Sequence, residues 1–86
     1  MKKKNSPNPH ISTAILEAVD NQLRGNDPPI VKQTYERLIK EGHTDDQTRR
    51  LIAYALLVEM NDMMAVMRMF DIKKYTALLN QLPELE

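Results

Sequence analysis

The chain has 86 residues, no cysteine and a formal net charge of zero at pH 7. This length allows one small domain whose core is barely sufficient for stability, so oligomerisation would help it. The absence of cysteine excludes a disulfide framework and a thiolate zinc site. Three of the twelve basic residues are Lys2, Lys3 and Lys4, so the remaining sequence is mildly acidic and lacks the clustered basic face of a nucleic-acid binder.

The segment 1–7 is polar after its initial methionine, and we expect it to be a disordered tail before a single helical domain at 8–86. No apolar stretch follows the lysines, as a signal peptide would require, and no apolar run is long enough to span a bilayer. We therefore expect a cytoplasmic protein with no membrane partner.

The first predicted helix covers residues 9–24. Asn8 can cap it, with Pro9 at the first helical position, where the missing N–H costs nothing. Gly25 follows, where a helix can end through a left-handed residue. Apolar side chains recur along one face at helical spacing: Ile11, Ala14, Ile15, Ala18, Val19 and Leu23.

A second helix is predicted at residues 28–41. Asp27 is placed to cap it, and Pro28 and Pro29 occupy its first turn. Gly42 provides the exit from this helix. Its buried stripe is predicted to consist of Val31, Tyr35, Leu38 and Ile39.

A third helix is predicted at residues 45–68. Thr44 and Gln47 match a capping box, while Asp45 and Asp46 place negative charge at the positive end of the helix dipole. From Leu51 to Met67 this helix is apolar on nearly every face, so we expect a central helix that is covered on several sides. Exposed ion pairs four residues apart are expected within it: Asp45 with Arg49, and Asp46 with Arg50.

A fourth helix is predicted at residues 72–82, with Asp71 as its cap and Pro83 at its end. Phe70 and Tyr75 have the spacing of a hydrophobic staple. No alternating run of β-branched residues indicates a strand. The predicted fold class is therefore all-α, a compact bundle of four helices around an apolar third helix.

Four methionines form one stripe on the third helix, because Met60, Met63, Met64 and Met67 are spaced at i, i+3, i+4 and i+7. Thioethers are soft and flexible, so such a stripe can fill a core, cover a subunit interface or ligate Cu(I). No histidine or cysteine accompanies the stripe, and the third helix needs covering. We therefore interpret these methionines as core or as a self-association surface.

Glu59 follows Ile52 and Leu56 along an apolar face of the same helix. A buried carboxylate must be paired or hydrogen-bonded, and its pKa can rise enough for acid–base chemistry. We expect Glu59 to be at least half buried and bonded to a tyrosine hydroxyl, with Tyr35 preferred over Tyr54, or to a backbone N–H at a neighbouring helix start.

A metal site is the alternative hypothesis, and it would need residues from several helices. No pair of metal ligands at bundle spacing occurs within a single helix. His43 is expected instead to be a loop residue that folds over the exit at Gly42. We identify no catalytic residue and no cofactor, and the candidate metal ligands are His10, Glu17, Glu36 and Glu59, with His43 as a further one.

The segment 34–56 also has the outline of a helix-turn-helix motif. Its second helix begins with Asp45 and Asp46, which would face phosphates if this end entered a DNA groove. An ordinary αα-hairpin is the better interpretation. Weak nucleic-acid binding is thus the third hypothesis.

Several short motifs occur between about residues 8 and 82: Asn8-Pro9, Leu16-Glu17, Asn21-Gln22-Leu23, Asp27-Pro28-Pro29, Thr34-Tyr35-Glu36-Arg37-Leu38, Gly42, and Ile52, Leu56 and Glu59. Together they resemble a group of small bacterial helical proteins classed only as a domain of unknown function, some found beside metal-binding tails. The resemblance implies a helical fold and a bacterial source, and no catalytic residue. Some members carry histidines where this chain has Asp46 and Arg50.

The predicted function is that of a non-enzymatic helical module. It would act by forming a homo-oligomer or by binding a larger protein partner. The predicted contact surface is the methionine stripe of Met60, Met63, Met64 and Met67, because the apolar third helix is too broad for three short helices to cover fully.

Overall fold

The computed structural model describes residues 11–84, which form helices and no strand. The predicted tail, the Asn8 cap and His10 lie outside the described residues. The helices confirm the all-α, four-helix class, with bounds α1 Thr13–Gly25, α2 Pro29–Lys40, α3 Asp45–Ala65 and α4 Ile72–Gln81.

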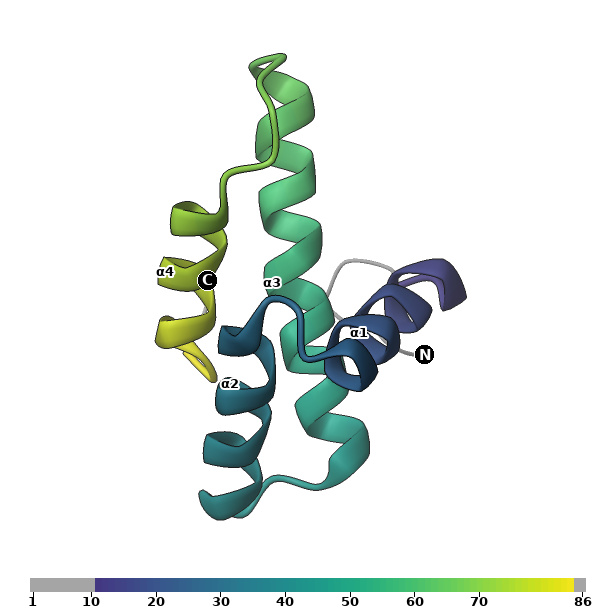
Figure 1. The fold of residues 1–86 in the computed structure, drawn as a ribbon, viewed down its shortest axis with the longest axis vertical. Helices are drawn as coiled ribbons and strands as arrows, with labels where there is room; N and C mark the ends of the chain where they lie inside the picture. Colours follow the sequence, from purple (N-terminus) through teal and green to yellow (C-terminus); the bar gives the residue numbers. More distant parts are fainter. Residues whose placement is uncertain (1–10, 85–86) are drawn as a thin grey trace, which may run out of the picture.

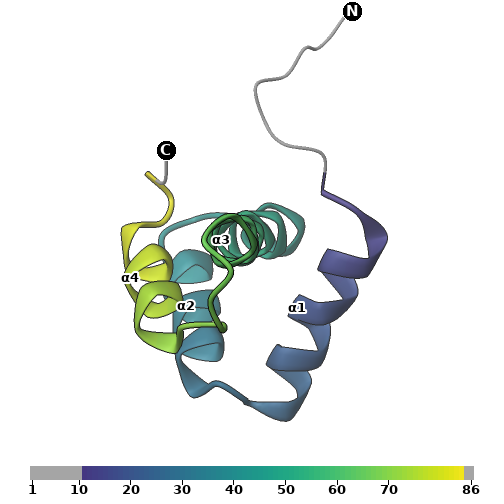
Figure 2. The ribbon, with the colours of Figure 1, turned by 90° about the horizontal axis from the view of Figure 1, so that it is seen from above.

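The longest helix, α3, contacts each of the other three helices. Viewed along α3, α1 lies on one side of it, and α2 and α4 lie on the other (Figure 2). The last turns of α3 extend past α1 and α2, and the connection 66–71 returns beside them before α4 begins (Figure 1). No helix within the described part is long and apolar enough to cross a membrane.

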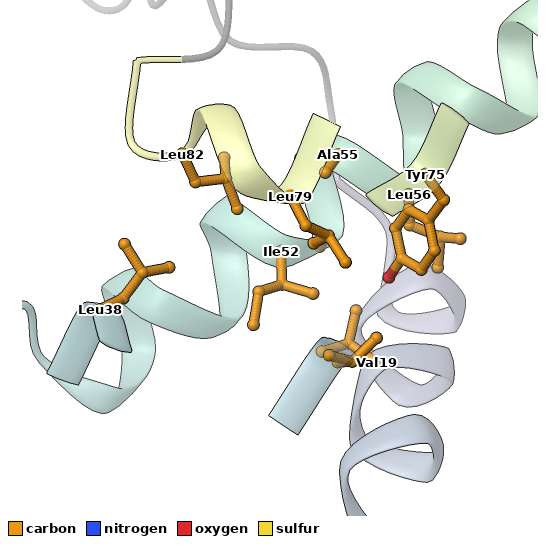
Figure 3. Packing of buried hydrophobic residues seen from close by; sticks show 10 residues of the cluster. Val19, Leu38, Ile52, Ala55, Leu56, Tyr75, Leu79 and Leu82 are labelled. Atoms are coloured by element: carbon orange, nitrogen blue, oxygen red, sulfur yellow. The ribbon is translucent and has the colours of Figure 1, made fainter. Parts of the chain in front are cut away.

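The core lies where the four helices meet around the middle of α3 (Figure 3). Apolar side chains recur every three or four residues on each helix, so each helix turns one stripe toward this point. The buried apolar residues are Val19, Val31, Leu38, Ile52, Ala53, Ala55, Leu56, Tyr75, Leu79 and Leu82.

The bounds of α1 correct two predictions. The helix begins at Thr13 rather than at residue 9, because the Ser12 side chain accepts a hydrogen bond from the Ile15 N–H and so acts as the N-cap. Gly25 is the last helical residue, and Asn26 with φ of 53° takes the left-handed position predicted for Gly25. Asparagine tolerates this conformation better than most residues.

The start of α2 also differs from the prediction. Pro28 is the N-cap and Pro29 the first helical residue, and no side chain caps this helix, so the predicted Asp27 cap is wrong. At the other end the predicted glycine exit is confirmed, with Gly42 at φ of 105°. The N–H groups of Gly42 and His43 donate to earlier carbonyls of α2, which is a Schellman motif.

The capping box of α3 is confirmed, since the Thr44 hydroxyl accepts from the Gln47 N–H and the Gln47 side chain accepts from the Thr44 N–H. The helix ends at Ala65, three residues before the predicted end. There Met67 takes a left-handed conformation, with φ of 55°, and the Arg68 N–H donates to the Met63 carbonyl at 3.0 Å. A Schellman motif therefore ends α3 without a glycine.

The start of α4 agrees with the prediction. The Asp71 carboxylate accepts from the N–H groups of Lys73 and Lys74. The rings of Phe70 and Tyr75 meet edge to face with centroids 5.4 Å apart, as the staple predicts. The helix ends at Gln81 rather than at residue 82.

Candidate functional site

Glu59 lies in a buried ionic cluster near the end of α3. Its side chain is 1% exposed. Two hydrogen bonds from the Arg68 guanidinium, at 2.7 and 2.9 Å, reach the carboxylate, and the Asp71 N–H donates a third at 2.9 Å. Arg68 also donates to Asp62 at 2.6 Å. We name this group, made of Glu59, Asp62, Arg68 and the Asp71 backbone, the Glu59 cluster.

The turn at Met67 creates this cluster. By reversing the chain it directs Arg68 back along α3, toward the acidic side chains of Glu59 and Asp62. The backbone N–H of Asp71, the N-cap residue of α4, donates a hydrogen bond to the Glu59 carboxylate. The connection 66–71 is therefore hydrogen-bonded to Glu59 of α3 at two of its positions, Arg68 and Asp71.

The electrostatics of Glu59 favour the ionised form. Hydrogen bonds from Arg68 and from the Asp71 N–H lower the pKa of Glu59, although burial opposes this. The pKa of Arg68 is raised by its bonds to Glu59 and Asp62. A general acid at neutral pH needs the opposite shift, a raised pKa. Glu59 in this arrangement holds the connection to α3 and is not poised to act as a general acid.

The predictions for Glu59 are confirmed in part. Burial and a bond to the backbone at a helix start are both correct. Tyr35 is the wrong partner, because its hydroxyl donates to Asp45, which raises the pKa of Tyr35. Arg68 was missed as a partner because a helix running to residue 68 would carry it away from Glu59. Arg68 reaches Glu59 through a left-handed turn at Met67, and a methionine gives no sequence signal for such a turn.

A second tyrosine makes a bond that the sequence analysis did not foresee. Tyr75 on α4 is fully buried, and its hydroxyl donates to the Gln22 side chain on α1 at 2.8 Å. Burial raises the pKa of Tyr75 far above its ordinary value. This bond connects the two helices that lie on opposite sides of α3.

The structure does not bring the candidate metal ligands together. Within residues 11–84 no group of three or more acidic or histidine side chains is arranged to hold a metal ion. Glu59 is paired with Arg68, and Glu17 is exposed on α1. His43 Nδ1 donates to the Leu38 carbonyl at 3.1 Å, as expected of a residue folded over the exit of α2.

The arginines at the start of α3 are paired with carboxylates. Arg49 donates two hydrogen bonds to Asp20 on α1, at 2.8 and 2.7 Å, so the predicted pair with Asp45 is wrong. The predicted pair of Arg50 with Asp46 is confirmed at 3.0 Å. Paired guanidinium groups beside acidic residues are a poor phosphate-binding surface.

A polar groove of about 460 Å³ lies between α1, α2 and the start of α3. Two contacts lie within this groove: the ion pair of Arg49 with Asp20 and the hydrogen bond from the Tyr35 hydroxyl to Asp45. Charged side chains of both signs line the groove. The lining residues are Asp20, Leu23, Arg24, Lys32, Tyr35, Glu36, Asp45 and Arg49.

Exposed apolar side chains follow closely along the chain from the last turn of α3 through the connection to the first residue of α4, and we name this set, Met64, Val66, Met67, Met69, Phe70 and Ile72, the apolar tip. In Figure 1 the end of α3 and the start of the connection are the part of the molecule farthest from the α2–α3 turn, and the chain then returns to α4. The exposed fractions are 68% for Met64, 60% for Val66, 91% for Met67, 86% for Met69, 41% for Phe70 and 45% for Ile72. Large exposed apolar groups that gather in one place are typical of an interaction surface.

The apolar tip divides the predicted methionine stripe. Met60 packs against the core and Met63 is partly buried, whereas Met64 and Met67 are exposed. Val66, Met69, Phe70 and Ile72 were not predicted as part of the surface, because Val66 lies off the methionine stripe of the predicted helix and the other three follow its predicted end at residue 68. Because α3 ends early, only Met64 and Met67 of the predicted stripe belong to the exposed surface, and residues that follow α3 form the rest of it.

Comparisons with models of protein families, with curated proteins and with solved structures found no match to this chain. The resemblance to a family of small bacterial helical proteins stays a prediction. A function for this chain is therefore inferred from the arrangement of its own residues.

Proposed function

We propose that this protein is a non-enzymatic helical module that self-associates, with a second copy of the chain bound at the apolar tip. One observation carries the proposal: the six large apolar side chains of the tip are between 41% and 91% exposed. Elsewhere in residues 11–84, Ile39 is the exposed large apolar residue, at 38%. The tip thus concentrates the apolar surface that the fold leaves in water.

The area of the tip suits a dimer. Its exposed fractions amount to roughly 800 Å² per copy, taking large side chains at about 200 Å² each. Two such faces in full contact would bury roughly 1,600 Å², within the range of about 1,200–2,000 Å² that is typical of stable specific interfaces.

The charges near the tip also allow two copies to meet. The formal net charge of the chain is zero, so two copies do not repel one another as a whole. Lys73 and Lys74 are exposed at the start of α4, and the Asp62 side chain is half exposed on α3. A two-fold contact can place the cations of one copy opposite the anions of the other.

The alternative predictions find less support. A metal site would require Glu59, which Arg68 already occupies, and nucleic-acid binding would require Arg49 and Arg50, which Asp20 and Asp46 neutralise. We also propose a cytoplasmic location, because a chain without cysteine suits a reducing compartment.

Light scattering and sedimentation of the full chain over a wide concentration range test the proposal. We expect a concentration-dependent dimer that the double variant Met67→Glu, Met69→Glu converts to a folded monomer, because charges replace buried apolar contacts. Ile39→Glu is the matched control, since it adds the same charge at an exposed apolar residue of α2, and it should leave the dimer intact. A wild-type monomer at every concentration would overturn the proposal.

A further inference from the structure

The connection between α3 and α4 differs in composition from the other two connections. The α1–α2 connection contains Pro28 and is flanked by Gly25 and Pro29, and the α2–α3 connection contains Gly42. Residues 66–71 contain neither glycine nor proline, and neither occurs anywhere from Asp45 to Gln81. The local sequence therefore contains no helix breaker that would prevent α3 and α4 from joining into one helix.

The observed turn also has a conformational cost. Met67 has φ of 55°, a left-handed conformation in which the Cβ of an ordinary residue crowds the following carbonyl. Its side chain is 91% exposed, so packing of that side chain does little to offset the cost of the left-handed conformation. A continuous helix through residue 67 would remove the crowding.

A second copy of the chain can supply the contacts that α4 makes with the rest of its own chain in the monomer. The two helices run in opposite directions along one another (Figure 1), and Tyr75 and Leu79 of α4 point into the cluster that contains Ile52 and Leu56 of α3 (Figure 3). Two straight α3–α4 helices related by a two-fold axis perpendicular to them are also antiparallel. Each copy of α4 can then occupy the same position on the partner's α3.

We infer that two copies associate by exchanging α4, so that in each chain α3 and α4 become one helix across residues 66–71 and α4 packs on the partner's α2 and α3. This inference rests on the proposed self-association and specifies its mechanism. Such exchange is a low-cost route to dimers, since the contacts of the monomer are reused.

Exchange also accounts for the exposed apolar tip. In two continuous antiparallel helices, the segments around residues 64–70 of the two chains lie side by side at the two-fold axis. Met64 and Met67, three residues apart, then share one helical face that the partner's segment covers. Side chains that are exposed in the monomer become the new interface of the dimer.

The Glu59 cluster opposes exchange. Arg68 reaches Glu59 only when the chain reverses at Met67, because nine residues of continuous helix would separate the two side chains by about 13 Å. Ionic bonds thus favour the closed monomer, while backbone strain and apolar burial favour the dimer. Exchange joins two chains, so its extent depends on protein concentration as well as on this balance.

Two substitutions at one position test the mechanism. Met67→Gly and Met67→Ala both remove the exposed side chain, but glycine favours the left-handed turn and disfavours a continuous helix, whereas alanine does the reverse. We expect the glycine variant to dimerise on the order of a hundredfold more weakly than the alanine variant. Equal dimerisation constants for the two variants would overturn exchange.

Crosslinking separates exchange from a simple contact between two tips. Val58 on α3 and Ala77 on α4 line the same small groove, and the chain has no native cysteine. In the Val58→Cys, Ala77→Cys variant, a short bis-maleimide should join two chains if α4 is exchanged, which gives a covalent dimer on a denaturing gel. The single variant Ala77→Cys is the control for random crosslinking.

Each outcome decides between the two claims. A dimer in light scattering whose crosslinks lie within one chain overturns exchange and leaves self-association standing. A monomer at every concentration overturns both. If the double cysteine variant does not fold, as judged by circular dichroism, the comparison of Met67→Gly with Met67→Ala still decides.

Discussion

At the scale of single residues, Glu59 is the buried carboxylate on which the connection 66–71 depends. Glu59→Ala removes the acceptor of two Arg68 hydrogen bonds and of the Asp71 N–H, while Arg68 keeps its bond to Asp62, and we expect a loss of about 2–3 kcal/mol in the free energy of unfolding. Glu59→Gln keeps one acceptor oxygen, so it should lose less. Urea unfolding measures both, with Glu17→Ala on the exposed face of α1 as a near-neutral control.

The ionisation of Glu59 predicts a pH dependence with a defined sign. Bonds from Arg68 hold the folded-state pKa below the ordinary value of 4.5, so the folded state favours the carboxylate. The resulting stability is present above pH 4.5 and is lost as the pH falls through the folded-state pKa. In urea unfolding at a series of pH values, the stability difference between wild type and Glu59→Gln should shrink below pH 4.5. A difference that grows in acid would contradict the ionised pair.

Met67 is the residue whose backbone conformation suits its side chain least. Met67→Gly should stabilise the closed monomer by about 0.5–1 kcal/mol, because glycine adopts positive φ without crowding and the methionine is almost fully exposed. Met69→Gly is the control, since Met69 is equally exposed and has no positive φ. Thermal unfolding at low protein concentration compares the two, and a gain in the Met69 variant alone would refute the strain argument.

At the scale of helices, two residues predicted to be N-caps should respond differently to alanine: Thr44, which caps α3, and Asp27, which was predicted to cap α2. Thr44→Ala removes the hydroxyl that accepts from the Gln47 N–H, so it should cost about 1 kcal/mol. Asp27→Ala should be nearly neutral, because Asp27 caps nothing in the structure. Equal losses in chemical unfolding would mean that the Asp27 cap predicted from the sequence forms after all.

The helices also depend on contacts that cross the bundle. Tyr75→Phe removes the bond to Gln22 while keeping the ring in the core, and we expect a loss of about 1 kcal/mol. A double-mutant cycle with Gln22→Ala measures the coupling between α4 and α1. Additive losses in that cycle would show that the two side chains do not interact.

At the scale of the whole molecule, the chain is small and leaves a large apolar surface at one end. Association of folded chains should therefore raise the thermal midpoint with protein concentration by mass action. In the Met67→Glu, Met69→Glu variant the midpoint should not change with concentration. Calorimetry over a wide range of concentrations measures this, and a wild-type midpoint that stays constant would contradict stabilisation by assembly.

Local physics controls the parts of the fold that could be predicted from the sequence. The apolar stripes that face the core follow from helical periodicity, except that Ile39, predicted in the buried stripe of α2, is 38% exposed. The Thr44 and Asp71 caps and the exit at Gly42 follow from side-chain chemistry and backbone freedom within a few residues. These interactions need no partner from a distant segment, so short motifs were enough to predict them.

Only the tertiary structure decided where α3 ends and what Glu59 binds. Nothing in residues 66–71 breaks a helix, so the local sequence favours the longer helix that we predicted. The turn at Met67 exists because Arg68, Asp71 and the buried face of α4 gain contacts with α3 once the chain reverses. Contacts between separate segments, such as Asp20 with Arg49, outweigh a local preference of this size, and they cannot be read from spacing along the chain.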